Sequence, residues 1–341
     1  MIRWENNMST YEARSVAATF ITQLERLSRD ANDLLNILSF FDPESIPVKI
    51  VVDGATDIVH SRRLPEVMPV DLSIMPASRQ RTTILQKMKK KWNRLRGRPP
   101  DCAKSQADRT NYDCRTSSKL KLLAAFICDQ IELPKAIREL QDLSLVELRS
   151  NIDMPTLRIH NLVRFMVQES VREEDTERDW LKSAVTLVCA AFRRIEDPGA
   201  PDRWAECEMF VPHVQLLTIQ WSFAHTSMDS ELIHANIGIA AYLKRCGRYS
   251  EAEALYRQVL AGTEKQLGVE HPDTLSMVQN LATVFQLQGQ YDKAEALYRQ
   301  VLAGREKQLG VEHPDTLSTV QKLASVFQQQ GRYNDAEELY G

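Results

Sequence analysis

Two consecutive stretches of this chain are nearly identical, and this repetition constrains the fold more than any other feature. Residues 249–290 align without a gap on residues 291–332, with 34 of 42 positions identical. A repeat of this length is typical of a helical solenoid, in which no unit can bury its apolar face alone and each stacks on its neighbour. Because solenoids present long continuous surfaces, the repeat predicts an interaction module.

Each unit carries the pattern of two amphipathic helices. In the stretch 274–288, apolar side chains recur at spacings of three and four, as expected for a helix with one buried stripe. Gly289 follows as a stop signal, and a second amphipathic stretch runs from Tyr291 to about Leu309. The small Ala294 lies where the two helices must approach closely. We therefore expect an antiparallel pair, whose first and second members are named helix A and helix B below.

The motif G-x-Y-x-x-A-E-x-L-Y closely resembles the tetratricopeptide repeat, and the long unit with L-G-x-x-H-P-D-T is similar to the kinesin light chain type. The resemblance covers residues 231–341, with a less regular first helix A at residues 231–246. It implies an α-α superhelix. The third unit stops at Gly341, eight residues after Tyr333, and at least three units are normally needed for a stable array. We therefore expect the last repeat to be truncated.

In the tetratricopeptide family, ligands lie along the concave face made by the A helices. The resemblance therefore assigns two rows of residues to a protein-binding groove. The rows are Ser276, Gln279, Asn280, Thr283, Gln286 and Leu287, and then Ser318, Gln321, Lys322, Ser325, Gln328 and Gln329. The amides suit hydrogen bonding to an extended peptide, since each offers donors and an acceptor. Differences between the twin units concentrate on helix A. They either mark a varied recognition surface or reflect free drift of solvated helix faces.

Before the repeats, residues 11–56 and 119–175 combine helical patterns with one hairpin. Strand-like runs at 145–149 and 156–160 are joined by a polar loop and flanked by apolar helical stretches at 31–41, 133–142 and 161–172. This arrangement predicts a small winged-helix-like domain. The stretch resembles the winged-helix segment of fungal NB-ARC or NACHT-type NOD-like receptors, on A-x-x-L-L-x-x-L-S-F-F-D-P-x-x-I-P and I-H-N-L-V-R. Residues 176–230 match the helical linker that precedes the repeats in that family.

A Met-His-Asp motif in that family contributes a histidine that reaches the β-phosphate of bound ADP. The resemblance places His160 at this position, with Asn161 in place of the acid. No G-x-x-x-x-G-K-[ST] loop occurs in the chain, although a nucleotide-binding core needs one to hold phosphates. We therefore expect a structural His160, no cofactor and no catalysis. The alternative is a part of a nucleotide-dependent signalling ATPase whose catalytic domain lies upstream.

Residues 57–118 form a basic insertion within the winged-helix pattern. From Arg79 to Arg98 there are nine Lys or Arg residues and no acid. A nuclear localisation patch, an RNA contact with Trp92 as a stacking surface and an anionic-membrane contact are the functional options. We favour a solvated, disordered insertion, because the segment has little apolar periodicity of its own.

Other classes of partner have little support in the sequence. The candidate recognition helix at 133–142 offers only Lys135 and Arg138 against two acids, so nucleic acid is not expected. No apolar run approaches the roughly 20 residues of a membrane span, and no signal peptide is visible, so we expect a cytoplasmic protein. Scattered cysteines, and the turn-like E-H-P-D at His271 and His313, predict no metal site. The expected partner is a protein or peptide, and self-association stays open.

Overall fold

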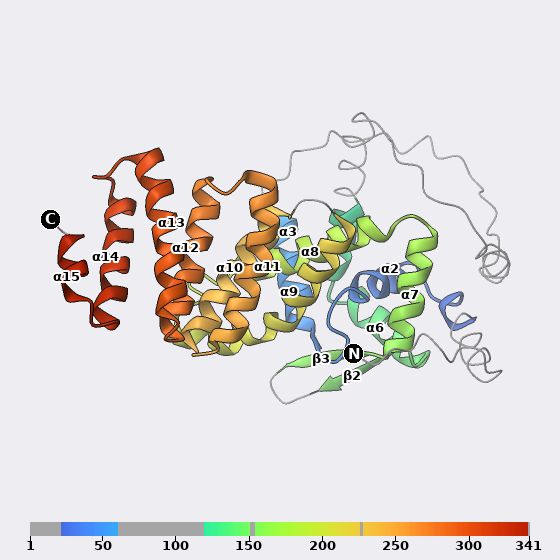
Figure 1. Ribbon diagram of the computed structural model, residues 1–341. Helices are drawn as coiled ribbons and strands as arrows, with labels where there is room; N and C mark the ends of the chain where they lie inside the picture. Colours follow the sequence, from blue (N-terminus) through green and yellow to red (C-terminus); the bar gives the residue numbers. More distant parts are fainter. Residues whose placement is uncertain (1–21, 61–118, 151–153, 226–227, 340–341) are drawn as a thin grey trace, which may run out of the picture.

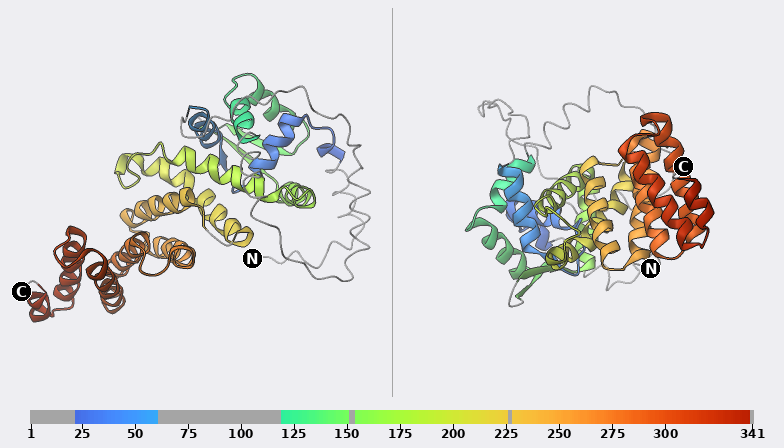
Figure 2. Two further views of the ribbon diagram at one scale, coloured as in Figure 1. Left: turned by 90° about the horizontal axis from the view of Figure 1, so that it is seen from above. Right: turned by 90° about the vertical axis from the view of Figure 1, so that its left-hand side faces the viewer.

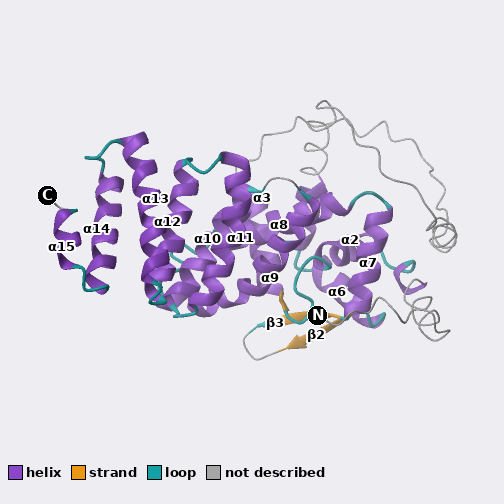
Figure 3. Ribbon diagram, in the orientation of Figure 1, coloured by secondary structure: helices purple, strands orange, loops and turns teal. Residues whose placement is uncertain are grey.

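The computed structural model describes residues 22–60, 119–150, 154–225 and 228–339. It is mostly helical: a helical unit with a small sheet lies at one end, and paired helices follow one another from there to the C-terminus (Figures 1 and 3). Within these ranges, no helix combines the length and the apolar character needed to cross a membrane. Of the predicted insertion, residues 57–60 complete a helix, and the remainder lies outside the described residues.

The N-terminal unit contains the expected hairpin within a larger arrangement. Its elements are α2 (Arg29–Leu38), β1 (Ile46–Pro47), α3 (Val48–His60), a helix at 119–127, α6 (Glu132–Asp142), β2 (Val146–Ser150), β3 (Pro155–Ile159) and α7 (Asn161–Glu173). The strands form an antiparallel sheet in the order β1-β3-β2, with Ile46 opposite Leu157 and Val146 opposite Ile159. The sequence predicted neither β1 nor α3. A two-residue strand such as β1 shows no alternation of apolar and polar residues.

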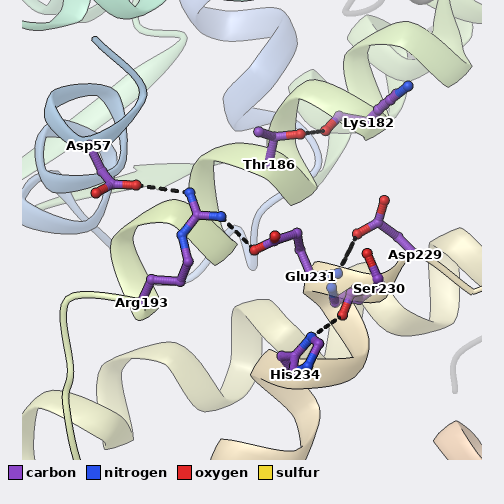
Figure 4. Close-up of polar contacts among 9 residues, drawn as sticks. Asp57, Lys182, Thr186, Arg193, Asp229, Ser230, Glu231 and His234 are labelled. Carbon is purple, nitrogen blue, oxygen red and sulfur yellow. Dashed lines mark hydrogen bonds and ion pairs between the residues drawn. The ribbon is translucent and has the colours of Figure 1, made fainter. Parts of the chain in front are cut away.

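The helical linker consists of α8 (Glu177–Phe192), the short η1 (Pro201–Arg203) and α9 (Trp204–Ala224). Helix α8 is the most enclosed, and it packs against α3, α9 and the first repeat helix. Gly54 permits the close contact with α3, since an added Cβ would lie 2.1 Å from the carbonyl oxygen of Leu187. After α8, Arg193 bridges Asp57 at 2.8 Å and Glu231 at 2.5 Å (Figure 4). The linker therefore joins the N-terminal unit to the repeats.

The repeats form the helix pairs α10 (Ser230–Arg245) and α11 (Tyr249–Leu267), α12 (Pro272–Leu287) and α13 (Tyr291–Leu309), and α14 (Pro314–Gln329) and α15 (Tyr333–Glu338). Each helix packs on the next one along the chain, and the pairs follow one another as a solenoid (Figure 2). The expected helices A and B are confirmed. The stop at Gly289 is confirmed too, because its φ of 75° favours glycine.

The A helices begin slightly earlier than the apolar pattern indicates. At α12, Nδ1 of His271 accepts a hydrogen bond from the Asp273 N–H at 3.2 Å, and at α14 His313 does the same for Asp315. A side chain that accepts from a free N–H of the first turn stabilises a helix start. These histidines therefore act as N-caps in the turns where the sequence predicts structural elements.

One buried histidine joins the linker to the N-terminal unit. His213 lies on α9 with no exposed surface, and its ring centroid is 5.4 Å from that of Phe41. The Asp42 N–H donates to its Nδ1 at 3.1 Å. Burial lowers the pKa of His213 from 6.5 to about 4, because an apolar surrounding disfavours the charged ring. In the folded protein, the His213 ring that contacts Phe41 and Asp42 is therefore in its neutral form.

We predict that stability falls on acidification because of His213. Its folded-state pKa is the lower one, so between pH 6.5 and about 4 the unfolded chain binds the proton more readily. The stabilising contribution of the neutral ring is fully present above pH 6.5. As the pH falls to about 4, the free energy of unfolding loses ~3 kcal/mol. Urea unfolding of wild type and His213→Gln at pH 7.5 and pH 4.5 measures it. The glutamine accepts the Asp42 N–H without titrating, so an equal acid-induced loss in both proteins would contradict the assignment.

Candidate protein-binding groove

The A helices α12 and α14 carry the predicted groove residues, and direct side-chain contacts connect these two helices. Oε1 of Gln279 accepts a hydrogen bond from the Thr319 hydroxyl at 3.3 Å. The Nε2 of Gln286 donates to the Ser325 hydroxyl at 3.2 Å and to Oε1 of Gln329 at 3.0 Å. The two predicted rows therefore lie on neighbouring helices and touch each other.

The structure divides the predicted residues into two groups. The first group forms hydrogen bonds within the solenoid; its members are Gln279, Thr283, Gln286, Ser325 and Gln329. The second group makes no side-chain hydrogen bond or ion pair to another described residue; its members are Ser276, Asn280, Leu287, Ser318, Gln321, Lys322 and Gln328. Ser276, Leu287, Gln321 and Gln328 are exposed. The second group is thus available to a partner.

A residue that the sequence analysis did not select lies beneath these rows. Arg305 projects from α13, a helix B, and its side chain is buried. Its Nη1 donates to Oε1 of Gln279 at 2.6 Å, to the Thr319 hydroxyl at 2.8 Å and to the Asp315 carbonyl at 3.0 Å. Burial lowers the pKa of Arg305, and the charge of Asp315 opposes this effect. No described carboxylate forms an ion pair with the guanidinium.

The preceding unit has a different pair at the same place. Thr263 stands where the next unit has Arg305, and its hydroxyl lies 3.7 Å from the sulfur of Met277, the counterpart of Thr319. A small residue on helix B thus faces a large one on helix A, and the sizes are reversed one unit later. Two of the differences between the twin units are therefore one compensated exchange. The two residues of each pair are 14 positions apart along the chain. The sequence therefore does not indicate that they touch until the packing of helices A and B is known.

Two lysines add positive charge on the A helices. Lys244 on α10 stands where α12 has Gln286, and Lys322 on α14 stands where α12 has Asn280. Both are partly buried, and neither forms an ion pair with a described residue. Burial is the main cause that lowers the pKa of Lys322, followed by the positive charges of Lys244 and Arg305. Burial and then Arg245 lower the pKa of Lys244.

His160 has a local structural role. It is the N-cap of α7, where its Nδ1 accepts a hydrogen bond from the Leu162 N–H at 3.2 Å. In the part of the chain that the structure describes, no group of three or more His, Cys, Asp or Glu residues is arranged to hold a metal ion.

We predict that the compensated exchange is energetically coupled. Thr319→Met removes the hydroxyl that Arg305 contacts and crowds the guanidinium, which costs ~2–3 kcal/mol because a buried charged donor loses a partner. The double variant Arg305→Thr with Thr319→Met reproduces the Thr263–Met277 pair and should unfold within ~1 kcal/mol of wild type. Equilibrium unfolding in urea measures this cycle. Additive effects of the two substitutions would show that the pair is not coupled.

The family comparison agrees with the helix pairing. Residues 231–307 and 275–341 match the family described as tetratricopeptide repeat. Two crystal structures of nearly identical TPR-like repeats, from a protein described as a kinesin light chain of Podosopora anserina, are 25% identical to this chain. Each aligns over 52% of this chain and 91% or 92% of its own, with a TM-score of 0.35.

Two further solved structures show lower identity. BtubC (BKLC) from P. vanneervenii is 15% identical over 69% of this chain and 89% of its own, with a TM-score of 0.39. A Rap protein complexed with competence and sporulation factor is 12% identical over 75% of this chain and 67% of its own, with a TM-score of 0.32. No curated protein matches this sequence. The family match identifies the C-terminal residues 231–341 as tetratricopeptide repeats.

Proposed function

We propose that this chain binds an extended segment of a partner protein along the A-helix face of its repeats. The observation that carries the proposal is the row of available side chains, Ser276, Leu287, Gln321 and Gln328, above a layer of residues that already hold one another. A ligand can use the outer row without breaking the contacts between units. Tetratricopeptide repeats are generally non-catalytic interaction scaffolds, and we propose that this chain has no enzymatic activity of its own.

The engaged amides have a specific consequence for a ligand. Oε1 of Gln279 accepts from Arg305 and Thr319, so its Nε2 is the end of the amide that faces no described partner. An amide held by its oxygen presents N–H donors, which fit a backbone carbonyl of an extended peptide. The groove thus combines one fixed donor with the adaptable side chains Gln321 and Gln328.

We further propose that residues 11–56 and 119–175 are the winged-helix-like relay of a cytoplasmic NOD-like receptor-type protein. The β2–β3 hairpin, the flanking α6 and α7 and the motif ending at Arg164 support this context. The second candidate is a part of a nucleotide-dependent signalling ATPase, with the catalytic domain on upstream sequence. His160 favours it through its exposed position, although Nδ1 is engaged by the Leu162 N–H and only Nε2 remains for a phosphate.

We predict that peptides selected by the full-length chain bind through the A helices. Peptides from a random display library are enriched on the immobilised chain, and their dissociation constants are measured for wild type, Ser276→Trp and Gln321→Ala. Ser276→Trp should weaken binding at least tenfold by filling the groove, and Gln321→Ala should weaken it about threefold through a lost hydrogen bond.

A bulky substitution outside the groove is the matched control. Gln300 is exposed on α13, a helix B, so Gln300→Trp should leave affinity within twofold of wild type. Equal circular dichroism and unfolding midpoints confirm that all variants fold. If Ser276→Trp binds the selected peptides as tightly as wild type, the A-helix face is not the binding surface.

A further inference from the structure

Helix α9 of the linker is apolar on two sides. Its inner side packs against α8 and α10, where Val214, Leu217 and Trp221 are buried. Its outer side carries a second row of apolar residues, at alternating spacings of four and three. This row is named the outer stripe below, and its members are Ala205, Met209, Pro212, Leu216, Ile219 and Phe223. Such spacing aligns side chains along one face of a helix, as in the seam of a helix pair.

The outer stripe is open to solvent over most of its length. Phe223 is 87% exposed, which is more than any other large apolar side chain among the described residues, and Ile219 is 45% exposed. Ala205 and Pro212 are exposed, and the remaining two members are half-buried. The solvent side of a helix ordinarily carries polar residues, and a contiguous exposed apolar patch marks an interaction site. The stripe is therefore a surface for another apolar helix face.

The sizes of the stripe residues fit a second copy of the same helix. When two α9 helices run antiparallel and cross at Val214, each member of the stripe lies opposite a member of the second copy. The opposed pairs are Ala205 with Phe223, Met209 with Ile219 and Pro212 with Leu216. The smallest residue thus meets the largest at each end of the contact, and residues of intermediate size meet in the middle. The stripe is therefore complementary to itself.

The charges of α9 also favour the antiparallel direction. Its only acids, Glu206 and Glu208, lie in the first two turns, and the helix contains no lysine or arginine. Each acid forms an ion pair within its own chain. In a parallel pair, all four acids would lie at the same end. In the antiparallel pair, Glu206 comes opposite Gln220 and Glu208 opposite Ser222 of the second copy, and both of these are neutral hydrogen-bond donors.

We propose that the outer stripe is a self-association surface, on which the α9 helices of two chains pair antiparallel to form a dimer. The surface lies outside the repeats, so the inference is independent of the proposed groove. From Ala205 to Phe223 the stripe is about 27 Å long and covers roughly 270 Å² of helix surface. Because a stable interface removes ~800 Å² per partner, the dimer is a reversible one, with a dissociation constant of ~10–100 μM.

Sedimentation equilibrium of the full chain, from about 5 to about 200 μM, measures this dissociation constant. Phe223→Lys places a charge in the stripe and should weaken the dimer at least tenfold. Leu122→Lys is the matched control: Leu122 is 72% exposed and lies on the helix at 119–127, so this variant should stay within twofold of wild type. Equal weakening in both variants overturns the proposal. So does a wild-type chain that remains monomeric at ~200 μM, and the stripe would then belong to a different protein.

A pair of opposite charges tests the direction of the helices. Ala205→Glu alone should weaken the dimer at least tenfold, and the double variant with Phe223→Lys should regain at least fivefold, because each glutamate meets a lysine of the second copy. Both substitutions suit α9, since an acid in the first turn and a cation in the last turn complement the helix dipole. A double variant no tighter than either single variant overturns the antiparallel arrangement.

The groove variant Ser276→Trp separates this surface from the proposed function. It should dimerise as wild type does, because Ser276 lies on α12 and not on α9. Circular dichroism spectra equal to that of wild type show that each variant folds. Loss of the dimer in folded Ser276→Trp would place the contact on the repeats and overturn the α9 surface, whereas peptide binding that survives Phe223→Lys leaves the groove intact.

Discussion

The stacking of each apolar helix stripe on the next is the constraint on which the rest of this structure depends. One connected cluster of buried side chains extends from Ala31 in α2 to Ala336 in α15, through the linker and every repeat. Tyr256 and Tyr298 sit at equivalent places in successive units and are almost fully buried. Full burial of a large side chain contributes roughly 1.5–3 kcal/mol, and no unit can gain it without a neighbour. The orientation of the A helices, and hence the placement of the predicted groove residues, follows from this packing.

The same physics explains which parts of the fold the sequence predicts well. A helix that buries one stripe repeats its apolar residues every three or four positions, so the predicted helix B at 291–309 agrees with α13 at both ends. The N-caps His271 and His313 shift the starts of the A helices, because a capping side chain lies outside the apolar period. Helix α3 was missed because Gly54, in its middle, reads in the sequence as a signal that ends a helix. In the structure, this glycine instead allows α3 to approach α8 closely.

The helix register of the predicted groove residues followed from the sequence, but their contacts did not. Family resemblance selects the residues of helix A by register, and the contacts between Gln286 and Ser325 show that these rows meet. Whether an amide faces a ligand or a neighbouring unit depends on what the next helix carries, and a single unit contains no such information. Arg305 was missed because it projects from helix B. Its hydrogen bonds reach the helices before and after its own, at Gln279 on α12 and Thr319 on α14.

Differences between the twin units follow the contacts, which argues that they are constrained rather than free. At the start of helix B, the pair Arg248–Glu251 becomes Gln290–Lys293 and then Arg332–Asp335, and each pair keeps a side-chain hydrogen bond of 2.6–2.7 Å. The exchange between Thr263–Met277 and Arg305–Thr319 keeps the volume at one contact. Lys322 is different, because no described side chain compensates its charge. None of the described contacts explains the exchange of Asn280 for Lys322 between the units.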